Sequence, residues 1–370
     1  MQSRGLHRIC IASNDATAHF CTMLATSADE QTCRSERVLC SDSGCDLDRY
    51  GKVQTQYRPP KKTAPELRKR NSGAGRLSGP QSRSAKLGPM PQLVWVDGHL
   101  RDGSSPSVPA LDHGLVVGDG VFESTKVMDG HAFALTRHLA RMDRSLAGLG
   151  LPPADHDQIR EGVGAVLAAT PGMPLGKLRW WVTGGLGPLG SDREAHGIRL
   201  RYHVAAAPIA RRPDSTAVHV VPWTRNERAA TAGLKTTSYA DNVIALAAAH
   251  RAGASEALFA NTRGELAEGT GSNVFVVIDG VALTPPLASG ALAGVTRGLV
   301  VEWAAAAGLP IREADLPMSV LAEADEVFLT SSTRDVQAVH AVDDRRLDPG
   351  PVTAAIAAVF ADRAAQLVDP

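Results

Sequence analysis

Residues 231–242 read TAGLKTTSYADN, and they place Lys235 among hydroxyl-bearing neighbours directly before an apolar helix. Lysine is rare in this part of the chain, because the last 281 residues contain only Lys126, Lys177 and Lys235. Lys126 falls in an alternating strand pattern and is interpreted as a residue of its polar face. Lys177 follows a Pro- and Gly-containing segment, where a solvated charge in a loop is expected. Local composition alone leaves open whether Lys235 is catalytic or an ordinary lysine.

Three later segments carry polar groups at the ends of strands or at the start of a helix. Glu268 stands at the edge of a strand, before the small-residue turn of EGTGSNVFVV. Gly294-Val295-Thr296 opens a helix, where free backbone N–H groups, the helix dipole and a hydroxyl together attract an anion. The segment LTSSTRD, residues 329–335, supplies a second hydroxyl-rich turn. Taken singly, each is interpreted as an ordinary turn or helix N-cap, and only their combination points to a site.

The charge of the chain divides near residue 90. The formal net charge is +0, but residues 1–89 carry +7 and the remainder carries −7. All five cysteines lie in the first 45 residues. Zero net charge argues against a protein whose whole surface is basic for nucleic-acid binding. No apolar run approaches the roughly 18 residues that a membrane span needs. Two chemically different segments are therefore joined in one chain.

Residues 1–89 show no sustained apolar period and are predicted to form a disordered basic extension. The closest cysteines, Cys40 and Cys45, do not have the paired spacing of zinc ligands, so no metal site is predicted. The segment is too polar for a secretory signal and too acidic for a transit peptide. One interpretation is that Met90 is the native start. Contact of the basic residues 49–86 with nucleic acid is a further hypothesis.

From Met90 onward, the apolar patterns predict an α/β (α+β) fold in two domains. A small N-terminal α/β domain is expected at 90–207, a linker at 208–213 and a larger domain at 214–370. Asp-Gly pairs predict tight hairpins, and Asp241 is expected to open a helix. Strands are expected at 93–96, 121–128, 177–185, 197–208, 216–223, 256–268, 272–285 and 325–331, and helices at 135–149, 159–167, 241–253, 297–307 and 352–366.

Together and in this order, these segments resemble the fold-type IV pyridoxal-phosphate enzymes, the class IV aminotransferase and lyase family. The resemblance covers nearly all of residues 93–345 and rests on DHGLVVGDGVFES, HLARM, GLKTTSYADNV, EGTGSNVF, TPPLASGALAGVTR and ADEVFLTSSTRDV. It implies a two-domain cytoplasmic enzyme with pyridoxal 5′-phosphate in the interdomain cleft and a small-molecule amino substrate. It also implies a homodimer in which the partner subunit lends residues to the site.

The resemblance implies roles for individual residues. Lys235 would form the imine with the cofactor, Glu268 would face the pyridine nitrogen, and Tyr239 would contact the ring-oxygen region. Arg179 would contact a substrate carboxylate. The phosphate would be bound by Arg141, Val295, Thr296, Ser332 and Thr333. These roles agree with the chemistry, since an amine of lowered pKa moves protons near neutral pH and a carboxylate keeps the ring nitrogen protonated.

Residues 117–124, VGDGVFES, bear on the choice of activity within the family. Branched-chain aminotransferases typically show YGxxxFEG-x-R, whereas here Ser124 replaces the glycine and Lys126 stands at the arginine position. The run KTTSY also departs from the KxGGNY of many of those enzymes. The favoured function is therefore 4-amino-4-deoxychorismate lyase, which releases 4-aminobenzoate and pyruvate in folate biosynthesis. The alternatives are a class IV aminotransferase acting on branched-chain or D-amino acids and a non-catalytic pyridoxal-phosphate-binding protein.

Overall fold

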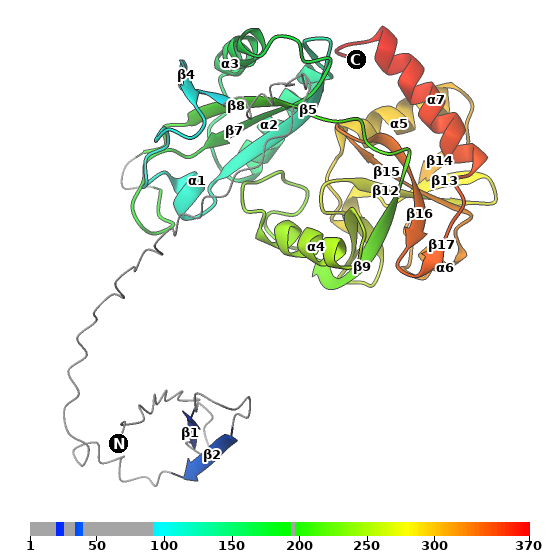
Figure 1. Ribbon diagram of the computed structural model, residues 1–370, viewed down its shortest axis with the longest axis horizontal. Coiled ribbons are helices and arrows are strands. Elements are labelled where there is room, and N and C mark those ends of the chain that lie inside the picture. Colours follow the sequence, from blue (N-terminus) through cyan, green and yellow to red (C-terminus); the bar gives the residue numbers. More distant parts are fainter. Residues whose placement is uncertain (1–19, 26–33, 40–91, 194–196) are drawn as a thin grey trace, which may run out of the picture. The chain divides into compact units, whose positions relative to one another are not determined.

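Figure 1 shows a computed structural model of the protein, which describes residues 20–25, 34–39, 92–193 and 197–370. In a unit by itself, β1 (Phe20–Ala25) pairs antiparallel with β2 (Arg34–Leu39). The sequence analysis predicts no regular structure for residues 1–89, and this strand pair is the part of that extension which the structure describes. The residues of β1, FCTMLA, include types that favour strands. The other predictions for residues 1–89 lie outside the described residues.

The first part of the larger unit is a six-stranded antiparallel sheet (Figure 1). Its strand order is β4-β3-β8-β7-β5-β6. The strands are β3 (Leu93–Val96), β4 (His99–Asp102), β5 (Gly120–Met128), β6 (His131–Ala132), β7 (Leu175–Thr183) and β8 (Arg201–Pro208). The helices are α1 (His113–Val116), α2 (Leu135–Gly148) and α3 (His156–Ala169). The observed spans confirm the predicted hairpins and the helices at 135–149 and 159–167.

Strand β7 has one apolar face in the core and one charged face directed away from it. Leu178 and Trp180 are buried in one core with Met142 of α2, which lies on the apolar stripe of that helix. Because side chains alternate along a strand, Lys177 and Arg179 lie on the opposite face. The strand expected at 177–185 is thus confirmed, and the expectation that Lys177 lies in a loop is wrong. Its side chain is nevertheless exposed, as a solvated charge would be.

The second sheet has nine strands in mixed orientation, with β9 parallel to both of its neighbours, β10 and β16. Its order is β11-β10-β9-β16-β15-β12-β13-β14, and β17 pairs with β16. The strands are β9 (Ser215–Arg225), β10 (Glu256–Asn261), β11 (Leu266–Gly269), β12 (Asn273–Ile278), β13 (Val281–Thr284), β14 (Ile311–Glu313), β15 (Glu326–Ser331), β16 (Asp335–Val342) and β17 (Arg345–Arg346).

Helices pack on the nine-stranded sheet (Figure 1). Their apolar side chains share cores with those of its strands. Phe275 and Phe328 stack at 4.6 Å between centroids in a core that includes Leu299 and Phe360 of two of these helices. The segments are α4 (Ala240–Arg251), the 3-10 turn η1 (Leu287–Ser289), α5 (Val295–Ala306), α6 (Val320–Glu323) and α7 (Pro351–Gln366). Strands buried on both faces read as continuous apolar runs, as in VFVV of β12. The division into domains at 208–213 remains a prediction.

Turn chemistry accounts for three of the hairpins. Asp97, Asp129 and Asp279 have φ of 45°, 48° and 49°, and each is followed by a glycine with positive φ. Two successive residues with positive φ make the tight turn that Asp-Gly favours. One helix start differs from its prediction: Tyr239 caps α4 without a side-chain hydrogen bond, and Asp241 lies inside the first turn. There its charge still favours the helix through the dipole.

Two features are absent from the described part of the chain. No helix in it is both long enough and apolar enough to cross a membrane. No group of three or more His, Cys, Asp or Glu side chains in it is arranged to hold a metal ion.

Candidate active site

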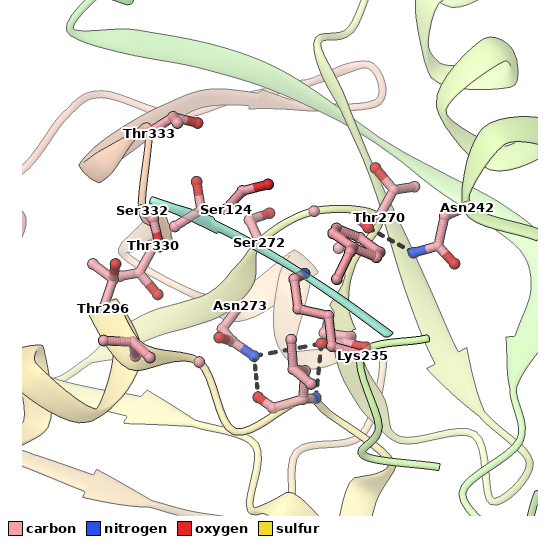
Figure 2. Close-up of a pocket in the computed structure, with 18 of the residues that line it drawn as sticks. Ser124, Lys235, Asn242, Thr270, Ser272, Asn273, Thr296, Thr330, Ser332 and Thr333 are labelled. Carbon is pink, nitrogen blue, oxygen red and sulfur yellow. Dashed lines mark hydrogen bonds between the residues drawn. The ribbon is translucent and has the colours of Figure 1, made fainter. Parts of the chain in front are cut away.

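A cavity of ≈ 210 Å³ lies where residues of both sheets meet, and Lys235 is at its centre (Figure 2). All nine residues predicted from the sequence line this one cavity: Arg141, Arg179, Lys235, Tyr239, Glu268, Val295, Thr296, Ser332 and Thr333. They come from positions up to 192 residues apart, 141 to 333. The lining also includes Phe122, Ser124, Lys177, Arg225, Thr270, Asn273 and Thr330, to which the sequence had assigned no role.

The backbone of Lys235 is held from two directions. Its N–H donates to Ser145 Oγ on α2 at 3.0 Å, and its carbonyl accepts from the Phe122 N–H on β5 at 3.0 Å. Thr236 forms a β-bridge with Val121, so the segment extends the edge of the six-stranded sheet. The position of the lysine is therefore set by a strand and a helix that also line the cavity.

The Lys235 amine sits over an aromatic ring, with Nζ 4.4 Å from the Phe122 centroid. Burial, and then the positive charge of Arg141, lower the pKa of Lys235 to about 8. A lysine with such a pKa has a substantial neutral fraction near neutral pH. It can act as a nucleophile or as a proton acceptor there, which an ordinary lysine does poorly.

Glu268 is the second-last residue of β11, and both oxygens of its carboxylate have partners. Oε2 accepts from the Leu292 N–H at 2.9 Å, and Oε1 lies 3.4 Å from Arg225 Nε. Asn273 Nδ2 approaches Oε2 at 3.5 Å and donates to the Leu292 carbonyl at 2.9 Å. Burial raises the pKa of Glu268, while Arg225 and the Leu292 amide act in the opposite direction. The carboxylate can therefore hold or share a proton with a basic nitrogen in the cavity.

The opposite end of the cavity is rich in hydroxyl groups and amides (Figure 2). The α5 helix begins here after Gly294, and no side chain caps it, so its first amides have no intrahelical acceptor. Thr296 lies in this first turn, and Ser332 and Thr333 follow β15. A Cβ at Gly294 would collide with the side-chain oxygen of Asn273, so only glycine permits this close approach. Uncapped helix amides and hydroxyls are the groups that bind a phosphate.

Arg141 lines the same end, but a buried acid occupies most of its hydrogen-bonding capacity. Its Nε and Nη2 donate to the Glu123 carboxylate at 2.7 and 2.6 Å, and Nη1 donates to the Ala293 carbonyl at 3.1 Å. His138 Nδ1 lies 2.7 Å from the same carboxylate, and its Nε2 lies 3.2 Å from Ser332 Oγ. Burial would raise the pKa of Glu123, but Arg141 and His138 hold it well below its usual range. Glu123 therefore anchors both the arginine and the contact to Ser332.

Tyr239 forms one side wall of the cavity. Its hydroxyl donates to the Thr270 carbonyl at 2.8 Å, and Asn242 Nδ2 donates to the same oxygen at 2.6 Å. Its ring meets Phe122 edge-on, with the centroids 5.1 Å apart. Burial raises the pKa of Tyr239 to about 12, so the hydroxyl keeps its proton at physiological pH. Its single proton is donated to the Thr270 carbonyl in this structure, so the role at a ring oxygen that the resemblance implies requires the hydroxyl to exchange that partner.

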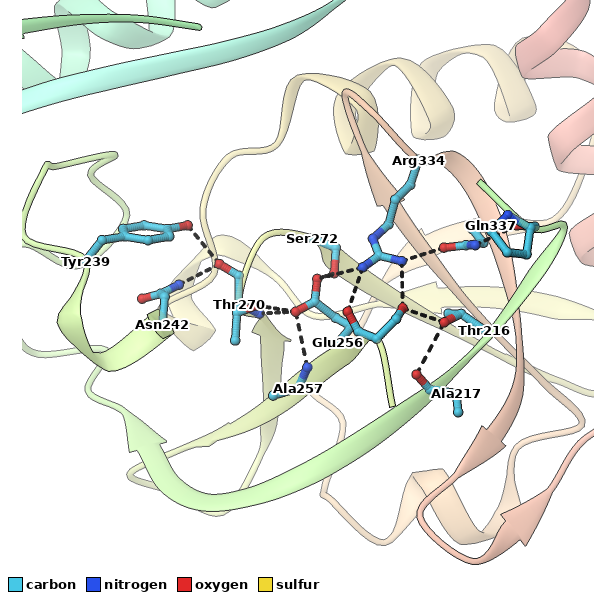
Figure 3. A network of polar contacts seen from close by, with 12 residues as sticks. Thr216, Ala217, Tyr239, Asn242, Glu256, Ala257, Thr270, Ser272, Arg334 and Gln337 are labelled. Carbon is cyan, nitrogen blue, oxygen red and sulfur yellow. Dashed lines mark hydrogen bonds and ion pairs between the residues drawn. The ribbon is translucent and has the colours of Figure 1, made fainter. Parts of the chain in front are cut away.

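A second buried carboxylate, Glu256, joins two turns that line the cavity (Figure 3). It accepts from the Thr270 N–H at 3.0 Å, from the Thr270 hydroxyl and from Ser272 Oγ at 3.0 Å. Its Oε2 also lies 3.5 Å from Arg334 Nη2, in the turn that carries Ser332. Nothing in the local sequence SEALFAN marks Glu256, because its partners are brought to it only by the sheet.

Lys126 is not a solvated residue of a polar face, contrary to the sequence-based expectation. It is 3% exposed, and its Nζ donates to Asp335 Oδ1 at 2.7 Å. The face of β5 that carries it is covered in the folded protein, which alternation along one strand does not reveal.

Comparison with known proteins identifies the family. Residues 120–342 match the sequence profile of the family described as amino-transferase class IV. The chain belongs to the class IV aminotransferase family. The bifunctional aminodeoxychorismate lyase / D-amino acid transaminase of Mycobacterium tuberculosis is 31% identical over 298 residues, covering 73% of this chain and 96% of that protein. The family assignment confirms the resemblance found in the sequence.

Two solved structures show the same fold. The branched-chain aminotransferase from Thermoproteus uzoniensis, solved with norvaline, superposes with a TM-score of 0.67 at 28% identity, covering 73% of this chain and 93% of that one. The 4-amino-4-deoxychorismate lyase from Pseudomonas aeruginosa superposes with a TM-score of 0.65 at 30% identity, covering 75% of this chain and 100% of that one. The fold is that of the fold-type IV enzymes, and members of this class IV family use pyridoxal 5′-phosphate.

The residues of the cavity fit this cofactor. Ser124 Oγ and Thr330 Oγ1 are buried in the cavity lining and have no hydrogen-bond partner among the described residues. The uncapped α5 amides add further free donors. A phosphate would satisfy groups at this end, Glu268 offers a carboxylate to a ring nitrogen, and Lys235 offers an amine to an aldehyde. When bound, pyridoxal phosphate supplies a conjugated ring that accepts the electrons of a substrate carbanion.

Proposed function

We propose that this enzyme is a 4-amino-4-deoxychorismate lyase, which converts its substrate to 4-aminobenzoate and pyruvate. The observation that carries the proposal is that Lys126 is buried in an ion pair with Asp335. Branched-chain aminotransferases typically have an arginine at this position, but here the side chain is buried and paired with Asp335. It offers no free cation to a substrate. Similarity to a bifunctional lyase and to a solved lyase structure supports the same choice.

In the proposed reaction, Lys235 is the side chain that transfers protons. Lys235 holds the cofactor and moves a proton from the ring carbon that bears the substrate amine. Loss of that proton and cleavage of the bond to the enolpyruvyl oxygen make the ring aromatic, giving 4-aminobenzoate. A proton delivered to the departing enolpyruvate completes pyruvate. The pKa of Lys235, about 8, suits an amine that both accepts and returns a proton.

The remaining predicted residues bind and orient. We assign Glu268 to the ring nitrogen and Tyr239 to the ring oxygen. The phosphate is assigned to Arg141, Val295, Thr296, Ser332 and Thr333. Arg179 is assigned to a substrate carboxylate, because it is a cation that lines the cavity beside Lys235.

The second candidate function is transamination of branched-chain or D-amino acids. It is supported by the similarity of the chain to the branched-chain aminotransferase structure and to the lyase that is also a D-amino acid transaminase. Lys235 and Glu268 would serve both reactions. A coupled assay of the loaded enzyme separates them, with release of 4-aminobenzoate as the expected result. Robust keto-acid formation from Leu, Ile, Val or D-Ala without 4-aminobenzoate would replace the first function by the second.

We also propose that the enzyme is a cytoplasmic homodimer that serves folate biosynthesis. Support for self-association comes from exposed apolar side chains on β9 and α4. Trp223, Val243 and Ile244 are 45%, 63% and 52% exposed, and Trp223 and Ile244 line one common hollow. Exposed apolar patches commonly mark protein interfaces. Light scattering after gel filtration should give twice the monomer mass, and a Trp223→Glu substitution should lower it.

A further inference from the structure

Two cations on β7 have no partner in the part of the chain that the structure describes. Lys177 and Arg179 lie two residues apart, so their side chains share one face of the strand. Both line the cavity that contains Lys235. Neither side chain makes a hydrogen bond or ion pair with any described residue. The Arg179 guanidinium lies 3.9 Å from the Phe122 centroid, and this stacking leaves its N–H edge free.

The neighbouring strand supplies no charge to neutralise them. In the register of β5 and β7, Ser124 lies opposite Arg179 and Lys126 lies opposite Lys177. The charge of Lys126 is already paired with Asp335, and Ser124 Oγ is itself without a partner. The Lys177 side chain is exposed by area, yet desolvation by the surrounding atoms and the positive charges of Arg179 and Arg212 all lower its pKa, and no acid acts in the other direction. Two like charges on one strand face repel each other, and an anion that binds both relieves this repulsion.

The same pair also borders a second hollow, which extends the space available to a substrate. This hollow has a volume of ≈ 620 Å³ and is lined by Lys177, Arg179, Trp181, His203 and Ala205, among others. A molecule held at Lys235 can therefore extend along β7 past both cations. The Arg179 guanidinium suits bidentate binding of one carboxylate, and the Lys177 ammonium suits a point contact to another.

We propose that Lys177 determines specificity by binding a second carboxylate of the substrate, beside the carboxylate that Arg179 holds. The site accordingly selects amino substrates with two carboxylates over those with one. This inference rests on the proposed function, because both concern the same cavity. Amino substrates with two carboxylates include the substrate of the lyase. It also applies to a transaminase, for which a dicarboxylic substrate would be preferred.

The test compares two probes that differ by one carboxylate, succinate and butyrate, bound to the pyridoxal-phosphate-loaded enzyme. Calorimetry or the shift of the cofactor absorbance gives each dissociation constant. For Lys177→Met, we expect succinate to bind about 10-fold more weakly while butyrate changes less than about 2-fold, on the scale of a partly exposed charge-assisted contact. Lys177→Arg should restore most of the succinate affinity. Arg101→Met, which removes an exposed charge of the same sheet, is the matched control and should change neither constant.

Equal succinate affinity in Lys177→Met and the parent enzyme would overturn the inference, as would equal losses for both probes. With the natural substrate, KM should rise in Lys177→Met while kcat stays within about 2-fold, because the residue binds a carboxylate remote from the reacting carbon. Release of 4-aminobenzoate is measured in parallel. Selective binding of succinate over butyrate without release of 4-aminobenzoate would refute the lyase proposal alone. Release of 4-aminobenzoate without a Lys177-dependent preference for succinate would refute the role of Lys177 alone.

Discussion

Lys126 on β5 and Asp335 on β16 form a hydrogen-bonded ion pair of 2.7 Å across 209 positions of the chain. The ammonium also lies 4.5 Å from the Phe133 centroid and 5.3 Å from that of Phe360. The side chain of Lys126 is 4% exposed and that of Asp335 is 42% exposed. The pair therefore links the two sheets. The buried ammonium of Lys126 has its charge neutralised by the partly exposed carboxylate of Asp335.

Removal of Asp335 should destabilise the protein more than removal of Lys126. Asp335→Ala leaves a buried ammonium without its partner, at a cost of about 3 kcal/mol in the free energy of unfolding. Lys126→Met removes the charge and keeps an apolar stem, so a cost of about 1 kcal/mol is expected. Urea unfolding of the two variants and the double variant measures the difference. Equal costs for the two single variants would show that the pairing contributes nothing specific.

Lys235→Ala should abolish covalent attachment of the cofactor. In the parent enzyme, reduction with borohydride after loading should fix the cofactor on the peptide that contains Lys235, as detected by mass spectrometry. The variant should give no labelled peptide and no cofactor absorbance band of the attached form. Lys177→Met is a useful control, since it removes another lysine of the cavity and should keep the label. A label on any peptide of Lys235→Ala would place the attachment elsewhere.

Glu268→Gln should keep the cofactor bound while turnover falls about 10²-fold or more, on general acid–base and electrostatic scales. The amide keeps the shape of the side chain and its contact to the Leu292 N–H, which lies 2.9 Å from Oε2. It cannot stabilise a proton on the ring nitrogen. Single-turnover kinetics with saturating cofactor provides the measurement. Unchanged turnover would mean that the ring nitrogen has another partner.

Glu123→Gln should weaken cofactor binding by about 10-fold without unfolding the protein. The carboxylate holds Arg141 and His138, and His138 in turn contacts Ser332. A neutral amide leaves the arginine less fixed at the phosphate end. Fluorescence titration with pyridoxal phosphate and with pyridoxal distinguishes a loss of phosphate binding from a general loss of cofactor binding. The loss should appear for the phosphorylated form, and an equal loss for both forms would argue against positioning of the phosphate ligands.

The rate of cofactor uptake should rise with pH around a midpoint near 8. The pKa of Lys235 is lowered to about 8 from an ordinary 10.5, and the neutral amine is the reacting form. Between these two values the unfolded chain binds more protons at this residue than the folded protein does. The stability of the cofactor-free enzyme should therefore increase with pH over that window. Stopped-flow mixing at several pH values tests the first point, and a midpoint above pH 10 would contradict it.

The sequence predicted the cavity residues because they lie in contiguous motifs. GLKTTSYADNV contains Lys235 and Tyr239, and LAGVTR contains Val295 and Thr296, so a resemblance transfers them directly. The hairpins at Asp97 and Asp129 were predictable for a local reason as well, since an Asp-Gly pair adopts the turn without help from the rest of the chain.

The supporting residues could not be predicted in this way. His138 and Ser332 are 194 positions apart, and no local pattern shows that they meet. No pattern in the sequence around Glu256 marks it, yet it is 2% exposed and accepts hydrogen bonds from Thr270 and Ser272. Lys126 was misread for the same reason. Buried polar partners are set by how the sheets pack, which the alternation of a single strand does not report.

Hydrogen bonds to Ser145 and to Phe122 tether the Lys235 backbone to the first sheet, and with it the proposed attachment point of the cofactor. Glu268 and the start of α5 belong to the second. With the proposed roles, a bound cofactor would act as a cross-link between groups on the two sheets. Loading should raise the melting temperature of the protein, because unfolding of the groups on either sheet would release the ligand.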